Sequence, residues 1–287
     1  MTYPGSNMVH EDGVEYTDCP LCFNSEKKIV YHLTKPFRVV CCEACGFHYL
    51  DPRIEEDRIA AYYGNDYFNN EQVGYSDYTF QEESLRLTFR RLLETLHARG
   101  LTGGTLLEIG AGYGFLLDEA RGYFSFRAGT ELSSAASRHA AQSADLLVHG
   151  GVDDLDKESR FNCIVMSQVI EHIYRPGEFI EKIKPHLLPE GKLIIITPDF
   201  GNIWRKIMGA GWPSFKVPEH VLYFDYESLR RFLTSAGFGR ISSLPYPHAF
   251  PLKLVAAKLN MTLPGRLDKI NIWLPRTCVA ICASTYD

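Results

Sequence analysis

Residues 105–114 read TLLEIGAGYG, a β-prone run followed by a glycine turn with G-x-G-x-G spacing, and residues 115–121 continue at helical spacing. A pyrophosphate-binding turn has two residues before its third glycine, whereas this turn is tighter by one residue. Glu108 precedes the first glycine, where a carboxylate would repel a pyrophosphate but favour an ammonium group, directly or through water. The stretch therefore predicts a strand–turn–helix unit for an amino-acid-bearing nucleotide without phosphate. A purely structural turn is the alternative.

Strand and helix patterns alternate along the rest of the chain. The expected strands are 105–109, 126–130, 145–149, 161–167, 192–197, 241–244 and 277–283, and the expected helices are 115–121, 133–142 and 177–188. This order predicts an α/β fold with a mostly parallel, Rossmann-like sheet that is covered by helices on both faces. Ligands bind such sheets at the carboxyl ends of the strands.

Two further acids follow the second and third expected strands. Glu131 ends the second strand, where a carboxylate can accept both hydroxyls of a ribose, with a surface or capping acid as the alternative. Asp153 is placed shortly after the third strand to meet an adenine amino group. Asp154 is its competitor, and an ordinary loop acid is the other interpretation.

The N-terminal part carries two cysteine pairs with C-x2-C spacing, Cys19 with Cys22 and Cys42 with Cys45. Two such pairs, with short β-prone runs between them, are typical of a tetrahedral zinc site on a β-ribbon. Cys41 adjoins Cys42 and can replace it as a ligand, and His48 is a weaker substitute. Four thiolates leave no open coordination position, so this zinc would be structural rather than catalytic.

The remaining cysteines and the composition limit the class of protein. Cys163, Cys278 and Cys282 lie in apolar, strand-like runs and are predicted to be core residues. The 287 residues are 45% hydrophobic, which allows one sizeable domain plus a small module. A net charge of −5 disfavours a nucleic-acid ligand held by its phosphates. Because neither a spanning apolar run nor a secretory signal is recognisable, we expect a cytoplasmic protein.

We expect three parts along the chain: a zinc-binding module at 1–55, a helical linker or cap at 56–100, and a nucleotide-binding domain at 101–287. Within the linker, apolar residues at helical spacing predict one amphipathic helix from Phe80 to Arg99. The glycines that follow directly would end this helix.

These motifs together resemble class I S-adenosylmethionine-dependent methyltransferases. The resemblance rests on residues 108–114, Glu131, residues 153–154, QVIEHI at 168–173 and GKLIIITPD at 191–199. It is strongest for the ubiquinone-biosynthesis-like branch, and residues 19–52 resemble the zinc ribbon that some of these enzymes carry. The motifs are specific for the superfamily and not for the acceptor.

The resemblance implies S-adenosylmethionine as the cofactor and gives its contacts. Gly110, Gly112 and Gly114 would let the backbone approach the cofactor, because a side chain there would fill its space. Four side chains would meet its parts: Glu108 the methionine end, Glu131 the ribose, Asp153 the adenine and Gln168 the sulfonium end.

Two histidines are the candidate catalytic residues on the acceptor side. Methyl transfer from a sulfonium requires alignment, and a base only where the acceptor must lose a proton. His172 follows the fourth strand, with a capping or packed ring as the alternative. His220 lies in VPEHVLYF at 217–224, and the resemblance places similar histidines at the acceptor pocket, which favours His220 slightly.

The segment at about 245–275 is expected to be a cap or insertion. Residues 240–276 contain six basic residues and one acid, in contrast to the acidic chain as a whole. A cap over the site or a homodimer face is the first interpretation. The alternative is contact with a membrane surface or with a phosphate-bearing acceptor, such as a lipid- or nucleotide-linked sugar.

The predicted function is methylation of a small molecule, glycan or natural-product intermediate, at oxygen in preference to nitrogen or carbon. The alternatives are an RNA methyltransferase, a non-catalytic binding scaffold and an oxidoreductase. The acidic balance disfavours RNA, as does SQVI at 167–170 in place of an Asn/Asp-Pro-Pro-Tyr motif. The intact glycines and acids disfavour a scaffold.

Overall fold

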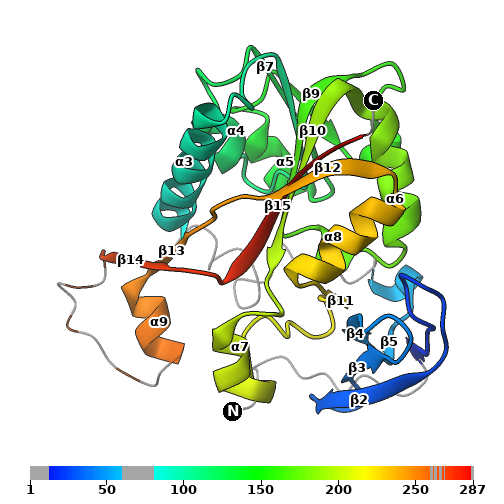
Figure 1. Cartoon of the computed structure of the whole chain (residues 1–287). Helices are drawn as coiled ribbons and strands as arrows, with labels where there is room; N and C mark the ends of the chain where they lie inside the picture. The colour runs from blue at the N-terminus through cyan, green and yellow to red at the C-terminus, as the bar shows by residue number, and fades with distance from the viewer. Residues whose placement is uncertain are drawn as a thin grey trace.

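The computed structural model describes residues 13–59, 81–258, 261, 264, 267 and 269–285, and its centre is a seven-stranded sheet (Figure 1). In the order β12-β15-β10-β9-β6-β7-β8, the sheet strands are Phe238–Ser243, Cys278–Thr285, Leu187–Pro198, Phe161–Ser167, Thr105–Ile109, Phe126–Glu131 and Leu146–His149. The strands from β10 to β8 are parallel, whereas β15 is antiparallel to both of its neighbours. The predicted fold class, including the antiparallel last strand, is confirmed.

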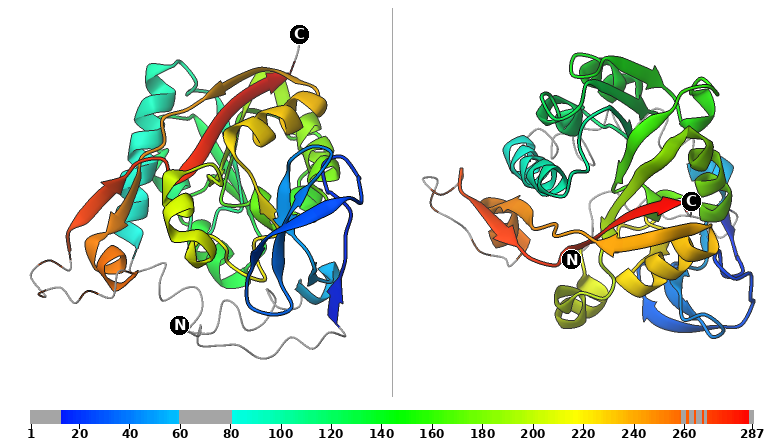
Figure 2. Two further views of the ribbon diagram at one scale, coloured as in Figure 1. Left: turned by 60° about the horizontal axis from the view of Figure 1, so that its bottom comes forward. Right: turned by 45° about the horizontal axis from the view of Figure 1, so that its top comes forward.

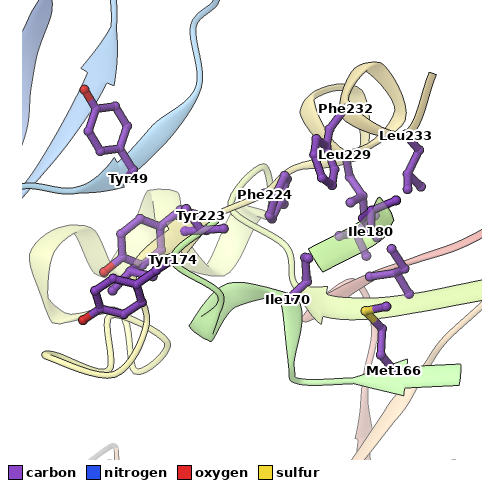
Figure 3. Close-up of a cluster of buried hydrophobic side chains, with 14 of the residues drawn as sticks. Tyr49, Met166, Ile170, Tyr174, Ile180, Tyr223, Phe224, Leu229, Phe232 and Leu233 are labelled. Atoms are coloured by element: carbon purple, nitrogen blue, oxygen red, sulfur yellow. The ribbon is translucent and has the colours of Figure 1, made fainter. Parts of the chain in front are cut away.

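Helices cover both faces of this sheet because its central strands are apolar on both sides. The helices are α3 (Glu82–Ala98), α4 (Phe115–Glu119), α5 (Ser134–Ala140), α6 (Pro176–Ile183) and α8 (Tyr226–Ser235). Side chains alternate along a strand. Leu193 and Ile195 of β10 therefore join one core with α6 and α8, and Ile194 and Ile196 join a second core with α3 and α4. Figure 3 shows part of the first core, where α8 packs toward Ile170 and Ile180.

Two element boundaries differ most from the expected ones, whereas the other bounds shift by at most three residues. The helix expected at 177–188 ends at Ile183, because Pro185 in the following 3-10 turn lacks the amide needed to continue the helix. Strand β10 starts at Leu187 and not at 192, since Leu187 already pairs with Phe161 before a bulge shifts the register. The helix expected at 80–99 is confirmed as α3, whose inward face buries Phe89.

The N-terminal part forms a four-stranded sheet that includes a strand from the second half of the chain. Its order is β11-β4-β3-β2, with β2 Lys27–His32, β3 Arg38–Cys42, β4 His48–Leu50 and β11 Leu222–Tyr223. A smaller pair joins β1 (Val14–Glu15) to β5 (Arg53–Ile54). Leu50 N donates to Val221 O at 2.9 Å, and the Tyr174 hydroxyl donates to Ile54 O at 2.7 Å. The module and the large sheet thus share one core, as the blue strands beneath α8 show in Figure 1.

A hairpin lies between the last two strands of the large sheet in the sequence. After β12 come β13 (His248–Pro251), α9 (Leu252–Lys258) and β14 (Asn271–Leu274), and β13 pairs antiparallel with β14. Both views in Figure 2 show this hairpin projecting from the body. Its base is held by Ala249 N, which donates to Thr88 Oγ1 of α3 at 2.9 Å. Among the residues that the structure describes, none of the helices has the length and apolarity to cross a membrane.

Candidate active site

The glycine turn after β6 is held against the end of β7. The amides of Gly110 and Ala111 both donate to Thr130 O at 2.9 Å, and the Gly112 amide donates to Glu131 Oε2 at 2.7 Å. Gly110, Gly112 and Gly114 all have positive φ angles, of 73°, 54° and 77°. This backbone conformation strongly favours glycine, so the turn explains the G-x-G-x-G spacing.

Close packing behind the turn is a second reason why two of these positions require glycine. A Cβ on Gly110 would lie 2.7 Å from Val169 Cγ2, and one on Gly114 would lie 2.8 Å from Ala140 Cα. At these two positions the protein's own atoms leave no room for a Cβ, and the approach of the cofactor stays a further, predicted reason for glycine.

Gly114→Ala should destabilise the fold more than the matched change Gly122→Ala. Both residues have positive φ, of 77° and 87°, so each variant should lose about 1–2 kcal/mol through the left-handed backbone. A Cβ at Gly122 meets nothing within 4 Å, whereas one at Gly114 meets the α5 backbone, which adds about 1–3 kcal/mol of overpacking. Urea unfolding measures both losses, and equal losses would contradict this account of the turn.

A pocket opens beside the turn at the carboxyl end of the sheet. It is lined by Leu85, Phe89, Glu108, Gly110, Ala111, Phe115, Ser167, Gln168, Tyr246 and His248. Three of the predicted cofactor residues, Glu108, Gly110 and Gln168, therefore lie on one cavity. The other predicted cofactor residues, Gly112, Gly114, Glu131 and Asp153, do not line this pocket.

Glu108 is the most unusual group in the pocket. Its side chain is buried, and Oε2 has no hydrogen-bond partner. Burial, and secondarily the negative charge of Glu131, raises the pKa of Glu108 well above its ordinary value. A buried carboxylate oxygen without a partner is costly, and an ammonium group in the pocket would satisfy it. The site therefore fits the amino-acid end of S-adenosylmethionine.

The carboxylate of Glu131, at the end of β7, binds the backbone of the glycine turn. Its two oxygens accept hydrogen bonds from the amides of Gly112 and Ser133 at 2.7 and 2.8 Å. Burial raises the pKa of Glu131, and these amides oppose that effect. A carboxylate has about four lone-pair positions, so two remain for hydroxyl donors.

Asp153 and Asp154 lie on the short turn Val152–Asp154 after β8, with their side chains turned to other partners. The Asp153 carboxylate pairs with Lys182 Nζ at 2.7 Å and is mostly exposed. Asp154 accepts the Gly151 amide at 2.8 Å. Neither side chain lines the pocket, so the structure does not bring Asp153 together with Glu108 and Gln168.

The loop after β9 presents Gln168 to the pocket in a strained conformation. Gln168 has a φ of 58°, which is rare outside glycine and typical of functional positions. Its Nε2 lies 3.6 Å from Cys278 Sγ, and that sulfur lies 3.8 Å from His248 Nδ1. Cys278 was expected in the core and is instead half-buried at this contact.

Tyr246 and His248 form a wall of the pocket that was not predicted from the sequence. These residues precede and begin β13, far along the chain from the glycine turn, and only the return of the chain past α3 places them here. Burial lowers the pKa of His248 to about 4, so this imidazole is neutral near pH 7. The Tyr-Pro-His run at 246–248, directly after an expected strand, was the available signal.

His172 and His220 come together although they are 48 positions apart in the sequence. Their ring centroids are 4.7 Å apart in an edge-to-face arrangement. Burial lowers the pKa of both imidazoles, that of His172 to about 3. Glu171 joins them: one ligand atom from each of the three residues lies within 4.8 Å of the other two. Burial raises the pKa of Glu171 to about 7.

The four predicted zinc ligands also converge. The Sγ atoms of Cys19 and Cys45 are 3.6 Å apart, and those of Cys22 and Cys42 are 3.5 Å apart. A tetrahedral zinc ion with Zn–S bonds of about 2.3 Å separates its sulfur ligands by about 3.8 Å, so the cluster fits zinc. Cys41 is outside this cluster, with its thiol directed at the Cys42 carbonyl.

The fold and the pocket together are typical of a nucleotide-binding α/β enzyme. The pocket holds the carboxylate of Glu108 at a place where a phosphate-binding site would need a hydrogen-bond donor. The model of one protein family, described as "Methyltransferase domain", matches residues 80–243, more than half of the chain. The chain belongs to this family and is an S-adenosylmethionine-dependent methyltransferase. No curated protein matches the chain.

Solved structures of other methyltransferases share the fold. A SAM-dependent methyltransferase from Thermotoga maritima is 17% identical with a TM-score of 0.54, covering 74% of this chain and 94% of that one. Magnesium protoporphyrin IX methyltransferase from Synechocystis, solved with bound SAH, is 14% identical with a TM-score of 0.52, covering 81% and 100%. A SAM-dependent methyltransferase from Archaeoglobus fulgidus is 16% identical with a TM-score of 0.52, covering 73% and 99%.

Proposed function

We propose that this methyltransferase acts on a small molecule, glycan or natural-product intermediate, with oxygen as the favoured acceptor atom. Bound S-adenosylmethionine supplies an electrophilic methyl group on its sulfonium. The observation that carries the proposal is the juxtaposition of Glu108 and Gln168 in one pocket, with the histidine pair at the turn that follows β9 at the same end of the sheet. The residues around the pocket would align the methyl group with the acceptor and exclude water.

The proposed cofactor contacts are those that the sequence predicts, two of which line the pocket. Glu108 would bind the ammonium group, and Gln168 would lie by the sulfonium end. Glu131 would accept the ribose hydroxyls while holding the glycine turn through the Gly112 amide. Asp153 remains the predicted adenine contact, for which its side chain would have to leave Lys182.

The histidines are proposed for the acceptor side. The Nδ1 atoms of His172 and His220 lie 3.1 Å from Glu219 O and 2.9 Å from Ser214 O. These contacts fix the tautomer of a neutral ring with Nδ1 protonated, so Nε2 carries the lone pair. His172 and His220 would thus present unprotonated nitrogens where an acceptor hydroxyl has to lose its proton.

We also propose that Cys19, Cys22, Cys42 and Cys45 hold a structural zinc ion, as in the zinc ribbons of the ubiquinone-biosynthesis-like branch. The support is the short sulfur–sulfur distances and the hairpin of β2 and β3 that carries the cluster. The division into a zinc module at 1–55, a linker or cap at 56–100 and a cofactor-binding domain at 101–287 is part of this proposal. The cytoplasm stays the predicted location.

The hairpin at 245–275 is proposed as a cap or homodimer face, with membrane or lipid-linked acceptor contact as the alternative. Its exposed apolar side chains include Met261, Ile270 and Trp273. We expect no flotation with liposomes, with or without anionic lipid, if the hairpin is a cap. Flotation that depends on anionic lipid and is abolished by Trp273→Ala would establish the membrane alternative.

A radiolabelled methyl-transfer screen tests the proposed function. The full chain is incubated with labelled S-adenosylmethionine and separate pools of sugars, phenolic metabolites, RNA and protein. We expect label in a small-molecule or glycan pool. Label in RNA alone would overturn the acceptor class, and cofactor binding without transfer to any pool would favour a scaffold.

A further inference from the structure

One wall of the cofactor pocket comes from the hairpin rather than from the large sheet. His248 is the first residue of β13, which packs beside α3 in Figure 1, and Ala249 N donates to Thr88 Oγ1 of that helix at 2.9 Å. His248 and Glu108 line the same cavity although they are 140 positions apart in the sequence. The hairpin thus brings an imidazole to the pocket that holds the buried carboxylate.

Two aromatic side chains hold the imidazole of His248 in place. The ring stacks on that of Phe250, with 4.2 Å between the centroids and 30° between the planes. Tyr246 meets the same ring edge-to-face at 5.9 Å. Because residues two apart lie on one face of an extended chain, the order Tyr-Pro-His-Ala-Phe at 246–250 places three rings in a row. Packing therefore fixes the orientation of the imidazole.

A thiol on β15 determines which nitrogen of this ring carries the proton. Cys278 Sγ lies 3.8 Å from His248 Nδ1 and accepts a hydrogen bond from Gln168 Nε2 at 3.6 Å. Burial raises the pKa of Cys278 to about 12, so the sulfur keeps its single proton near pH 7. The Gln168 amide donates to the sulfur, which leaves the thiol proton for Nδ1. A neutral imidazole that accepts at Nδ1 has its own proton on Nε2.

The charges of the pocket and of the cofactor do not yet match. Among the described residues that line the cavity, Glu108 is the only one with a formal charge, and the proposed function pairs it with the ammonium group. The carboxylate on the same carbon of the cofactor needs hydrogen-bond donors. No described residue forms a hydrogen bond with His248 Nε2. Its N–H group is therefore a donor for a ligand in this cavity.

We propose that His248 Nε2 donates a hydrogen bond to the carboxylate of the methionine end of S-adenosylmethionine, and that Cys278 is the positioning residue that sets the tautomer. This contact rests on the proposed function, in which Glu108 takes the ammonium group. The sheet and the hairpin then divide the amino-acid end between them: Glu108 binds the cationic group and His248 the anionic one. The hairpin thereby selects ligands that keep the carboxylate.

Calorimetry on the full chain compares S-adenosylmethionine with its decarboxylated form, which keeps the sulfonium and the ammonium group. Wild type should bind the decarboxylated form about 10- to 100-fold more weakly, because a hydrogen bond to a charged group is lost. His248→Phe keeps a ring for packing on Phe250. It should weaken S-adenosylmethionine binding by a similar factor, but binding of the decarboxylated form by less than about 3-fold. His32→Phe, at an exposed histidine of β2, is the matched control that should bind both ligands as the wild type does.

Nitrogen-15 NMR of the imidazoles tests the part assigned to Cys278. The signals of His248 are those that disappear in His248→Phe. We expect the Nε2-protonated tautomer in the wild type and in Cys278→Ser, whose hydroxyl can also donate to Nδ1. Cys278→Ala removes this donor, so both tautomers should be populated and S-adenosylmethionine should bind more weakly than to Cys278→Ser. An Nδ1-protonated ring in the wild type would overturn the proposal.

The decarboxylated ligand also distinguishes a failure of this contact from a failure of the proposed function. Equal losses for both ligands in His248→Phe, or unchanged binding of S-adenosylmethionine, would overturn the carboxylate contact and leave the methyltransferase site standing. A wild type that binds neither ligand would remove the proposed cofactor site together with this contact. Loss confined to the ligand with the carboxylate is the result that supports it.

Discussion

Glu108→Gln should weaken S-adenosylmethionine binding by about 10- to 100-fold, because the variant loses a charged hydrogen bond to the ammonium group. The same change should raise the thermal midpoint of the ligand-free protein. In the wild type the buried Oε2 has no partner, and its charge is disfavoured by burial and by Glu131. A neutral amide of the same shape removes that charge. Binding and stability are therefore expected to change in opposite directions.

The destabilising effect of the Glu108 charge should also appear in the pH dependence of the free energy of unfolding. The pKa of Glu108 is raised in the folded protein, so the proton that it holds there stabilises the native state at low pH. This contribution is lost as the pH rises through the raised pKa. The free energy of unfolding of the wild type should thus fall, relative to that of Glu108→Gln, as the pH rises above the ordinary glutamate range.

Calorimetry and thermal unfolding on wild type, Glu108→Gln and Glu158→Gln test this prediction. Glu158 is exposed on the loop before β9, so its variant should match the wild type in both measurements. A variant of Glu108 that binds S-adenosylmethionine normally would contradict the assignment of this carboxylate to the ammonium group.

Cys22→Ser should cost more than about 4 kcal/mol of stability in the N-terminal sheet, as losses of structural metal do. The loss of stability should affect the segment around His220, the proposed acceptor side, more strongly than the cofactor pocket. Strand β11, directly after His220, pairs with β4 through Leu222 with Tyr49 and Tyr223 with His48. The four-stranded sheet that carries the cysteine cluster therefore supports the chain segment that carries His220.

Hydrogen exchange measures where the loss falls. Amides of β4 and β11 should lose protection in Cys22→Ser, whereas those of β6 and β7, which hold the glycine turn, should keep theirs. S-adenosylhomocysteine affinity should then change by less than about 3-fold, that is, by under 1 kcal/mol. Cys41→Ser is the matched control, since this neighbouring thiol lies outside the cluster. Zinc loss in Cys41→Ser but not in Cys42→Ser would show the ligand assignment to be wrong.

The order of elements was predictable because the pattern that defines each strand is local. β6 and β9 alternate or run apolar over a few residues, and Gly110 to Gly114 mark the turn between strand and helix. The early start of β10 was not predictable. Its first residue, Leu187, pairs with Phe161, and a bulge between Leu187 and Lys192 then shifts the register. The turn-forming residues Pro189 and Gly191 lie in this bulge, so the sequence alone predicts a loop there.

The site residues at the ends of the sheet strands were predictable from the sequence. Those that come from distant segments of the chain were not. Glu108 is the penultimate residue of β6 and Gln168 follows β9 directly, so the sheet alone brings them together. Tyr246 and His248 reach the pocket only because the hairpin returns past α3. The contact of His172 with His220 depends on the pairing of β11 with β4 of the N-terminal sheet, a long-range register that no local pattern encodes.

A crystal structure of the full chain with S-adenosylhomocysteine tests the central claim most directly. The account predicts the amino group of the ligand within hydrogen-bonding distance of Glu108 Oε2 and the ribose hydroxyls at Glu131. Adenosine lying outside the pocket that Gly110, Gln168 and His248 line, or a diphosphate seated on the glycine turn in its place, would contradict it.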